Sequence, residues 1–75
     1  MNTININQPV YSFIEAINKM LDGYKITPLD ENGPLDGYFE FDSTHRAVYW
    51  VDGETNRSVY SRCIWKHVND IFVIK

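Results

Sequence analysis

The spacing of hydrophobic and polar positions changes at residue 23 and divides the chain into two parts. Before it, the apolar residues of NQPVYSFIEAINKMLDGY recur at helical spacing, with polar residues on the other side. The apolar stripe consists of Val10, Phe13, Ile14, Ile17, Leu21 and Tyr24, with Met20 at its edge. This pattern predicts one amphipathic helix over roughly residues 9–22.

Both ends of the predicted helix carry residues that favour helix termination. Asn7 can cap the first turn, and Pro9 is tolerated there because its missing N–H would have no helical partner. Gly23 can adopt the left-handed conformation that ends a helix. The helix needs a sheet to cover its apolar side. We expect that contact to join Phe13, Ile14, Ile17 and Leu21 to an inner sheet face that includes Phe39 and Phe41.

After Gly23 the apolar residues alternate with a period of two, which is typical of strands. The segments YKITPL, GYFEFD, AVYWV, SVYSRCIWK and IFVIK are candidate strands, with turn-forming STHR and DGETNR between three of them. In GYFEFD, Phe39 shares one face with Phe41, while Tyr38, Glu40 and Asp42 share the other. The sequence thus predicts one α+β domain over residues 1–75, with an N-terminal amphipathic helix packed on an antiparallel β-meander of three to five strands.

The segment before the last predicted strand allows two interpretations. With a period of two, residues 58–66 form a strand, which their β-branched and aromatic residues favour. With a period of 3.6, residues at about 61–70 form a second helix whose apolar stripe includes Ile64, Trp65 and Val68. We prefer the strand and keep the helix as the alternative.

The composition is that of a chain that folds. Hydrophobic residues make up 44% of the 75 residues and aromatic residues 15%, more than a disordered segment carries. The single cysteine, Cys63, excludes an internal disulfide, and no apolar run approaches the roughly 20 residues of a membrane span. No secretory leader pattern follows Met1. We expect a cytoplasmic protein with no membrane partner.

Charge is distributed unevenly along the chain, whose net charge is −3. Residues 30–54 carry seven acids and one base, Arg46, whereas the remainder carries three acids and six bases. A separation of this size favours the steering of a charged partner. The seven acids are Asp30, Glu31, Asp36, Glu40, Asp42, Asp52 and Glu54.

The segment DENGPLDGYFEFD has the acids of a calcium-binding loop but not their spacing. Counted from Asp30, position 5 is Pro34, position 6 is Leu35 and position 12 is Phe41, where an EF-hand loop requires an oxygen ligand, a glycine and a glutamate. The dipeptides Asn-Gly and Asp-Gly within it predict turns instead. The acids of this segment are therefore free to serve a partner.

Few groups in the chain could hold zinc or carry out catalysis. Cys63 and His67 stand four residues apart, and with His45 they make three soft ligands where a structural zinc site needs four. Asp42 could orient His45, but no phosphate-binding loop or nucleophile motif accompanies them. A domain of this size rarely builds the closed cleft that nucleophilic catalysis requires. We expect no metal, no cofactor and no enzymatic activity.

Two kinds of binding module remain. Tyr60 with Arg57, Arg62 and Lys66 could bind nucleic acid, because single-strand binders interleave basic and aromatic residues. Against this, the net charge is negative and would repel phosphates. We treat nucleic-acid binding as the alternative.

The preferred interpretation is a protein-interaction module with an acidic, aromatic surface. The seven acids, with Tyr38 and Tyr49 as aromatic anchors, would occupy a basic surface such as that of a nucleic-acid-handling protein. Small acidic domains of this type are common among inhibitor and accessory proteins of bacteria and their phages, although no motif narrows the choice. A small core with many aromatic residues also leaves apolar surface uncovered, so we expect a homodimer or a tight complex.

Overall fold

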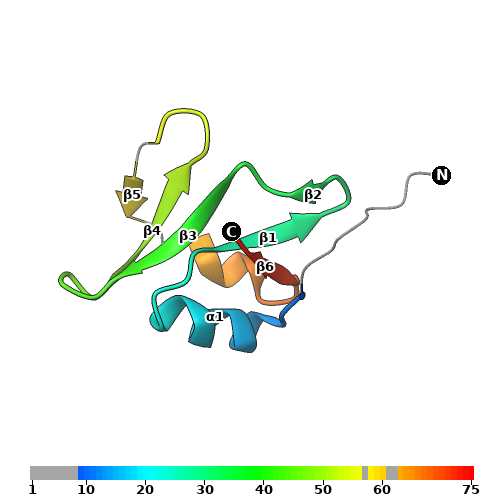
Figure 1. Ribbon diagram of the computed structural model, residues 1–75, viewed down its shortest axis with the longest axis horizontal. Helices are drawn as coiled ribbons and strands as arrows, with labels where there is room; N and C mark the ends of the chain where they lie inside the picture. The colour runs from blue at the N-terminus through cyan, green and yellow to red at the C-terminus, as the bar shows by residue number, and fades with distance from the viewer. Residues whose placement is uncertain (1–8, 57, 61–62) are drawn as a thin grey trace.

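One helix packs on one face of an antiparallel sheet (Figure 1). The computed structural model describes residues 9–56, 58–60 and 63–75. Helix α1 spans Phe13–Leu21, and a short 3-10 helix, η1, spans Cys63–His67. The strands are β1 (Ile26–Asp30), β2 (Gly33–Pro34), β3 (Gly37–Asp42), β4 (Ala47–Asp52), β5 (Ser58–Tyr60) and β6 (Phe72–Ile74). This arrangement confirms the predicted α+β fold.

Hairpin connections join most of the strands as a meander. β1 pairs with β3, β3 with β4 and β4 with β5, all antiparallel, and β6 returns to pair with β1. These strands form the main sheet, and the short β2 pairs with the end of β1. In the longest ladder Phe39 lies opposite Trp50, and Glu40 lies opposite Tyr49. Because side chains alternate along a strand, this register puts Phe39 and Glu40 on opposite faces of the sheet.

Helix α1 begins at Phe13 rather than at residue 9, because Ser12 caps it. The Ser12 hydroxyl accepts a hydrogen bond from the Glu15 amide (3.3 Å), and the Glu15 carboxylate accepts one from the Ser12 amide (3.0 Å). This reciprocal capping box satisfies two N–H groups at the helix start, and the bond from the Ser12 amide holds the pKa of Glu15 below its ordinary value. The predicted cap, Asn7, lies outside the described residues. Gly23 ends the helix with a φ of 104°, as predicted.

The buried face of α1 is rotated from the predicted one. Phe13, Ala16 and Met20 are buried, whereas Ile14 and Leu21, both predicted to face the sheet, are 66% and 53% exposed. The sequence misleads here because α1 is apolar on two adjacent faces. The face that includes the small Ala16 side chain lets the helix approach the sheet closely, and this is the face that becomes buried.

The inner face of the sheet carries the aromatic residues predicted for it. Phe39 is buried, with its ring centroid 4.7 Å from that of Trp50, and Phe41 is half-buried against the same core. Gly37 has a φ of 137°, and a Cβ there would lie 2.5 Å from the Trp50 ring, so only glycine fits. The buried core cluster consists of Phe13, Ala16, Met20, Ile26, Phe39, Ile64 and Phe72.

Residues 58–66 do not form the single strand that we preferred from the sequence. β5 covers only Ser58–Tyr60, and η1 begins at Cys63. The alternative, a second helix at about 61–70, is closer to the structure, although η1 is a short 3-10 helix. In η1, Ile64 is buried and the Trp65 ring lies 5.7 Å from that of Phe13. Ile64 therefore closes the core beside the start of α1, whereas Trp65 and Val68 of the predicted stripe are exposed.

Candidate functional site

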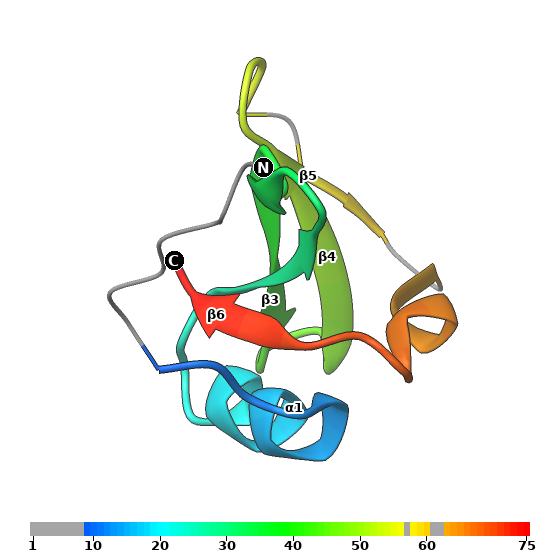
Figure 2. The ribbon, with the colours of Figure 1, turned by 90° about the vertical axis from the view of Figure 1, so that its right-hand side faces the viewer.

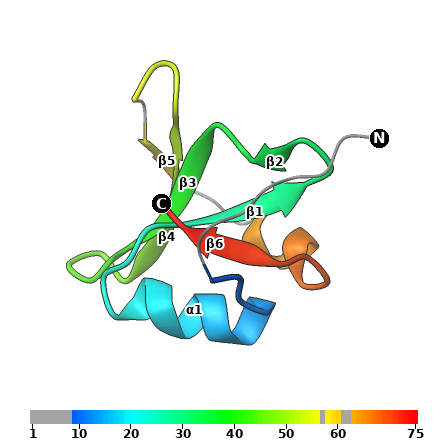
Figure 3. The same cartoon turned by 45° about the vertical axis from the view of Figure 1, so that its right-hand side comes forward.

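Five of the seven acids predicted to contact a partner lie in or beside two turns, the β1–β2 hairpin and the β4–β5 turn, which Figures 1 and 3 show pointing in different directions. Asp30 ends β1, Asp36 directly precedes β3, and Asp52 ends β4. Asp36 and Asp52 are close, because Gly37 pairs with Asp52, whereas Asp30 pairs with Gly33 in the β1–β2 hairpin, four residues beyond the position where β1 pairs with β3. Glu31 and Glu54 lie in the adjoining turns. We call these five residues the acidic end.

Asp42 and Glu40 lie away from the acidic end. Asp42 ends β3 at the opposite end of the sheet, opposite Ala47. Six steps of extended strand separate it from Asp36, which is about 20 Å at roughly 3.3 Å per residue. Glu40 is half-buried on the sheet face that α1 does not cover. Figure 3 shows the β3–β4 turn far from the β1–β2 hairpin, so the predicted surface is divided.

Backbone hydrogen bonds to carboxylates hold two turns of the acidic end. Asp30 Oδ1 accepts a hydrogen bond from the Asn32 amide (2.7 Å). Asp52 Oδ1 accepts hydrogen bonds from the amides of Glu54 and Thr55 (2.8 and 3.2 Å). Aspartate is favoured at the start of turns because its side chain can make such local bonds. The two aspartates therefore have a structural role, and their charges are held in fixed positions.

In the described part of the chain, no lysine or arginine forms an ion pair with the acidic end. Glu31, Asp36 and Glu54 are exposed, and both ion pairs among the described residues join a histidine to an aspartate elsewhere. Lys75 comes near, since its Nζ donates a hydrogen bond to the carbonyl of Leu35 (2.9 Å). Among the described residues, these carboxylates therefore keep their negative charges without a paired lysine or arginine.

Tyr38, the predicted aromatic anchor, is already engaged within the chain. Its ring is half-buried, and Lys25 Nζ lies 5.0 Å from the ring centroid, within the distance of a cation–π interaction. Tyr49, the second predicted anchor, is half-buried and has a partner of its own. Both predicted anchor rings are therefore engaged within the chain.

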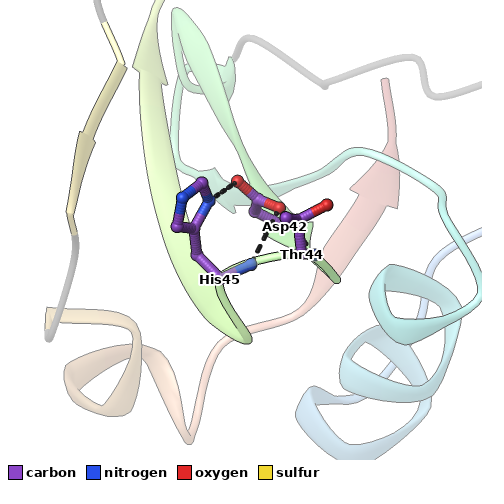
Figure 4. Close-up of polar contacts among 3 residues, drawn as sticks. All are labelled: Asp42, Thr44 and His45. Carbon is purple, nitrogen blue, oxygen red and sulfur yellow. Dashed lines mark hydrogen bonds and ion pairs between the residues drawn. The ribbon is translucent and has the colours of Figure 1, made fainter.

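Asp42 and His45 form a carboxylate–imidazole pair at the β3–β4 turn (Figure 4). His45 Nδ1 lies 2.8 Å from Asp42 Oδ2, and the amides of Thr44 and His45 donate to Oδ1 (2.9 and 3.2 Å). The side-chain hydrogen bond with His45 is the main cause that lowers the pKa of Asp42. The His45 side chain is 69% exposed, and Thr44 lies on the side of Asp42 away from the imidazole. The pair thus stabilises a turn and lacks the closed geometry of nucleophilic catalysis.

His67 does not adopt the zinc-ligand geometry that its spacing from Cys63 suggested. Both residues belong to η1, and in a 3-10 helix residues three apart, not four, lie one above the other. His67 Nδ1 instead lies 2.7 Å from Asp70 Oδ2, with its ring against Phe39 and Phe72. No group of three potential metal ligands occurs among the residues that the structure describes. His67 is a packing residue held by its aspartate.

The predicted nucleic-acid-binding residues are only partly described. Arg57 and Arg62 lie outside the described residues. Lys66 is exposed in η1, so it does not share a strand face with Tyr60 of β5, as the sequence had suggested. The proposed row of basic and aromatic side chains on one strand is therefore wrong in its geometry.

Comparison with known proteins finds no matching family model, no similar curated protein and no similar solved structure. Within the described ranges, no helix has the length and apolar character needed to cross a membrane. The candidate site consists of five carboxylates in and beside two turns, two of them fixed by turn hydrogen bonds.

Proposed function

We propose that the protein is a small interaction module that binds a basic surface of another macromolecule through the acidic end. The observation that carries this proposal is that five of the seven acids lie in the β1–β2 and β4–β5 turns and directly before β3, with no lysine or arginine ion pair among the described residues. Proteins that bind nucleic acid present such basic surfaces, because lysine and arginine contact the phosphates. Occupation of that surface would make the protein an inhibitor or accessory factor.

The turns of the acidic end suit it to charge recognition. Asp30 and Asp52 are held by their backbone hydrogen bonds, so little side-chain entropy is lost when a partner binds them. Glu31 and Glu54 extend into solvent beside them. Exposed charges mainly increase the rate of association, and their effect weakens as salt rises. We expect a fast, salt-sensitive complex.

The rival function is nucleic-acid binding, and one observation favours it. Trp65 and Lys66 are consecutive exposed residues of η1, and an exposed indole ring and an amine could stack on a base and contact a phosphate. The acidic end would oppose such binding at long range. The two functions therefore predict opposite outcomes for substitutions in the acidic end.

Two further expectations belong to this proposal. A cytoplasmic location is consistent with a chain that has a single cysteine. Homodimerisation stays a prediction, and it does not depend on the acidic end.

The test is capture of partners from a cell lysate by the tagged protein at roughly 0.1 M and 1 M salt, where the screening length is about 10 Å and 3 Å. The Glu31→Lys/Glu54→Lys variant reverses two exposed charges that hold no turn. We expect the wild type to capture a basic protein that elutes with salt, and this variant to lose at least tenfold in affinity for that protein.

The matched control is Asp22→Lys/Glu40→Lys, which changes the net charge equally at positions outside the acidic end. It should retain capture. Equal loss in both variants would mean that net charge alone drives binding. Recovery of nucleic acid, lost on Lys66→Glu but not on Glu31→Lys/Glu54→Lys, would establish the rival function.

A further inference from the structure

Four residues of the chain with a carboxylate or amide side chain of aspartate or asparagine directly precede a glycine. They are Asp22, Asn32, Asp36 and Asp52. At such a pair the glycine nitrogen can attack the side-chain carbonyl carbon of the preceding residue and close a succinimide ring, because glycine carries no Cβ to block the approach. The aspartates are ionised near neutral pH, and a negative carboxylate resists nucleophilic attack. The neutral amide of Asn32 therefore makes the most reactive of the four pairs.

The surroundings of Asn32 leave its side chain free to react. The residue lies at the tip of the β1–β2 hairpin and is exposed. Its backbone N–H donates to Asp30 Oδ1 (2.7 Å), but no described residue forms a hydrogen bond with its side-chain amide. A Cβ placed on Gly33 would have no heavy atom within 4 Å apart from its chain neighbours. Nothing among the described residues therefore crowds this side of the Asn32–Gly33 peptide.

The hairpin that carries this pair is short and weakly held. β2 spans only Gly33–Pro34 and pairs with the last two residues of β1. Pro34 has no N–H to donate to the ladder, and Figures 1 and 2 show the hairpin away from α1. Segments with few hydrogen bonds and few apolar contacts open locally, without unfolding the whole chain. Local opening would expose the Gly33 main chain, which is buried in the closed hairpin.

The aspartate–glycine pairs are held more firmly. A Cβ on the buried Gly37, which follows Asp36, would lie 2.5 Å from the Trp50 ring. Asp52 Oδ1 accepts the turn hydrogen bonds from two amides. The N–H of Gly23 donates to the last turn of α1. Among the four pairs, only Asn32–Gly33 combines a neutral amide, an exposed side chain without a described hydrogen bond, and open space at the glycine.

We propose that Asn32 is a site of spontaneous deamidation. The Gly33 nitrogen gives up its proton and bonds to Asn32 Cγ, the bond from Cγ to the side-chain nitrogen breaks, and ammonia leaves. Water then opens the succinimide at either carbonyl, which yields aspartate or isoaspartate. One amide and one water become one carboxylic acid and one ammonia, so the reaction needs no oxidant, cofactor or enzyme. It is a covalent modification that changes the charge of the hairpin.

Both products add a negative charge beside Asp30 and Glu31. The net charge goes from −3 to −4, because one neutral amide becomes one carboxylate. Isoaspartate also lengthens the main chain by one carbon in the turn between the paired Asp30 and Gly33, which should disrupt their pairing. The added charge should strengthen salt-sensitive capture of a basic partner. That consequence rests on the proposed function, whereas the reaction itself does not.

The test compares reaction rates in the folded chain with those in the same chain unfolded in guanidinium chloride, at one pH, by mass spectrometry of its peptides. The ratio of the two rates at each pair removes the intrinsic chemistry and leaves the effect of the structure. We expect folding to slow deamidation of Asn32 by no more than about tenfold, because the hairpin opens locally. Folding should slow isomerisation at Asp36 at least about 100-fold, because Gly37 is packed against Trp50.

The matched variant is Asn32→Gln, which keeps the amide and the net charge but would have to close a larger, less favourable ring. It should show no conversion at this position, and near-UV circular dichroism should match that of the wild type. If folding slowed Asn32 as much as Asp36, or if Asn18 in α1 converted faster, the proposal would be overturned. Capture by Asn32→Asp, expected to exceed that of the wild type at low salt, is measured separately, so the modification and the acidic-end proposal can fail independently.

Discussion

At the scale of single residues, two turns that look different in the sequence share one geometry. Asp42 and Asp52 each accept hydrogen bonds from the amides two and three residues later. The residues four positions after them, Arg46 and Asn56, have φ values of 52° and 55°. The sequence predicted turns in both segments but not the left-handed arginine, because propensities at this position favour asparagine or glycine. Tertiary pairing of the flanking strands imposes the conformation.

Replacement of Arg46 by glycine should therefore stabilise the protein. Glycine adopts a positive φ without the steric cost that a longer side chain carries, although it adds entropy to the unfolded chain. We expect Arg46→Gly to raise the free energy of unfolding by about 0.5–1 kcal/mol in urea denaturation. Asn56→Gly should raise the free energy of unfolding by less, because asparagine tolerates the left-handed region of positive φ. Destabilisation by Arg46→Gly would show that the arginine side chain makes a contact that outweighs the backbone strain.

At the scale of elements, the sequence predicted which segments form a helix and strands better than it predicted their boundaries and faces. The helix starts late because the Ser12–Glu15 capping box stops it, a signal that was visible in the sequence as Ser-x-x-Glu. The buried face could not be chosen, since periodicity alone does not rank two adjacent apolar faces. The 3-10 helix η1 lies within the alternative helix at about 61–70, which ranked second because the β-branched and aromatic residues of 58–66 favoured a strand.

The corrected helix face gives a direct stability test with two neighbouring residues of α1. Met20 is 1% exposed and Leu21 is 53% exposed. Met20→Ala should lower the free energy of unfolding by about 2–4 kcal/mol, because it removes buried apolar volume from the core. Leu21→Ala should lower the free energy of unfolding by less than about 0.5 kcal/mol, measured at concentrations where the chain is monomeric. If the two substitutions lowered the free energy of unfolding equally, Leu21 would be as buried as the sequence predicted.

At the scale of the whole molecule, the acids that are grouped along the sequence in residues 30–54 are only partly grouped in the folded structure. Antiparallel pairing brings Asp52, which ends β4, beside Asp36, which precedes β3, while Asp30 lies in the β1–β2 hairpin. The same pairing sends Asp42 to the other end, although Glu40 and Asp42 are close in sequence to the rest. Composition over residues 30–54 cannot show this division, because it depends on which end of a strand each acid occupies.

An acidic end with no ion pair to a described lysine or arginine should also lower stability, and salt should reveal this. Carboxylates held at one end of a folded molecule repel one another more than they do in the extended chain. When the screening length falls from about 30 Å at 0.01 M salt to about 8 Å at 0.15 M, this repulsion weakens. We expect the Tm of the monomeric protein to rise by about 3–6 °C over this range, measured in sodium chloride by circular dichroism.

The charge-reversed variants locate the source of that salt dependence. Glu31→Lys/Glu54→Lys should melt higher than the wild type at low salt and change little as salt is added, because two reversed charges turn repulsion into attraction at the acidic end. Asp22→Lys/Glu40→Lys, with the same net charge, should retain most of the wild-type dependence. If that control flattened the response equally, the repulsion would be spread over the whole molecule. The carboxylates would then not act as one concentrated field, and a basic partner would have no reason to prefer this end of the sheet.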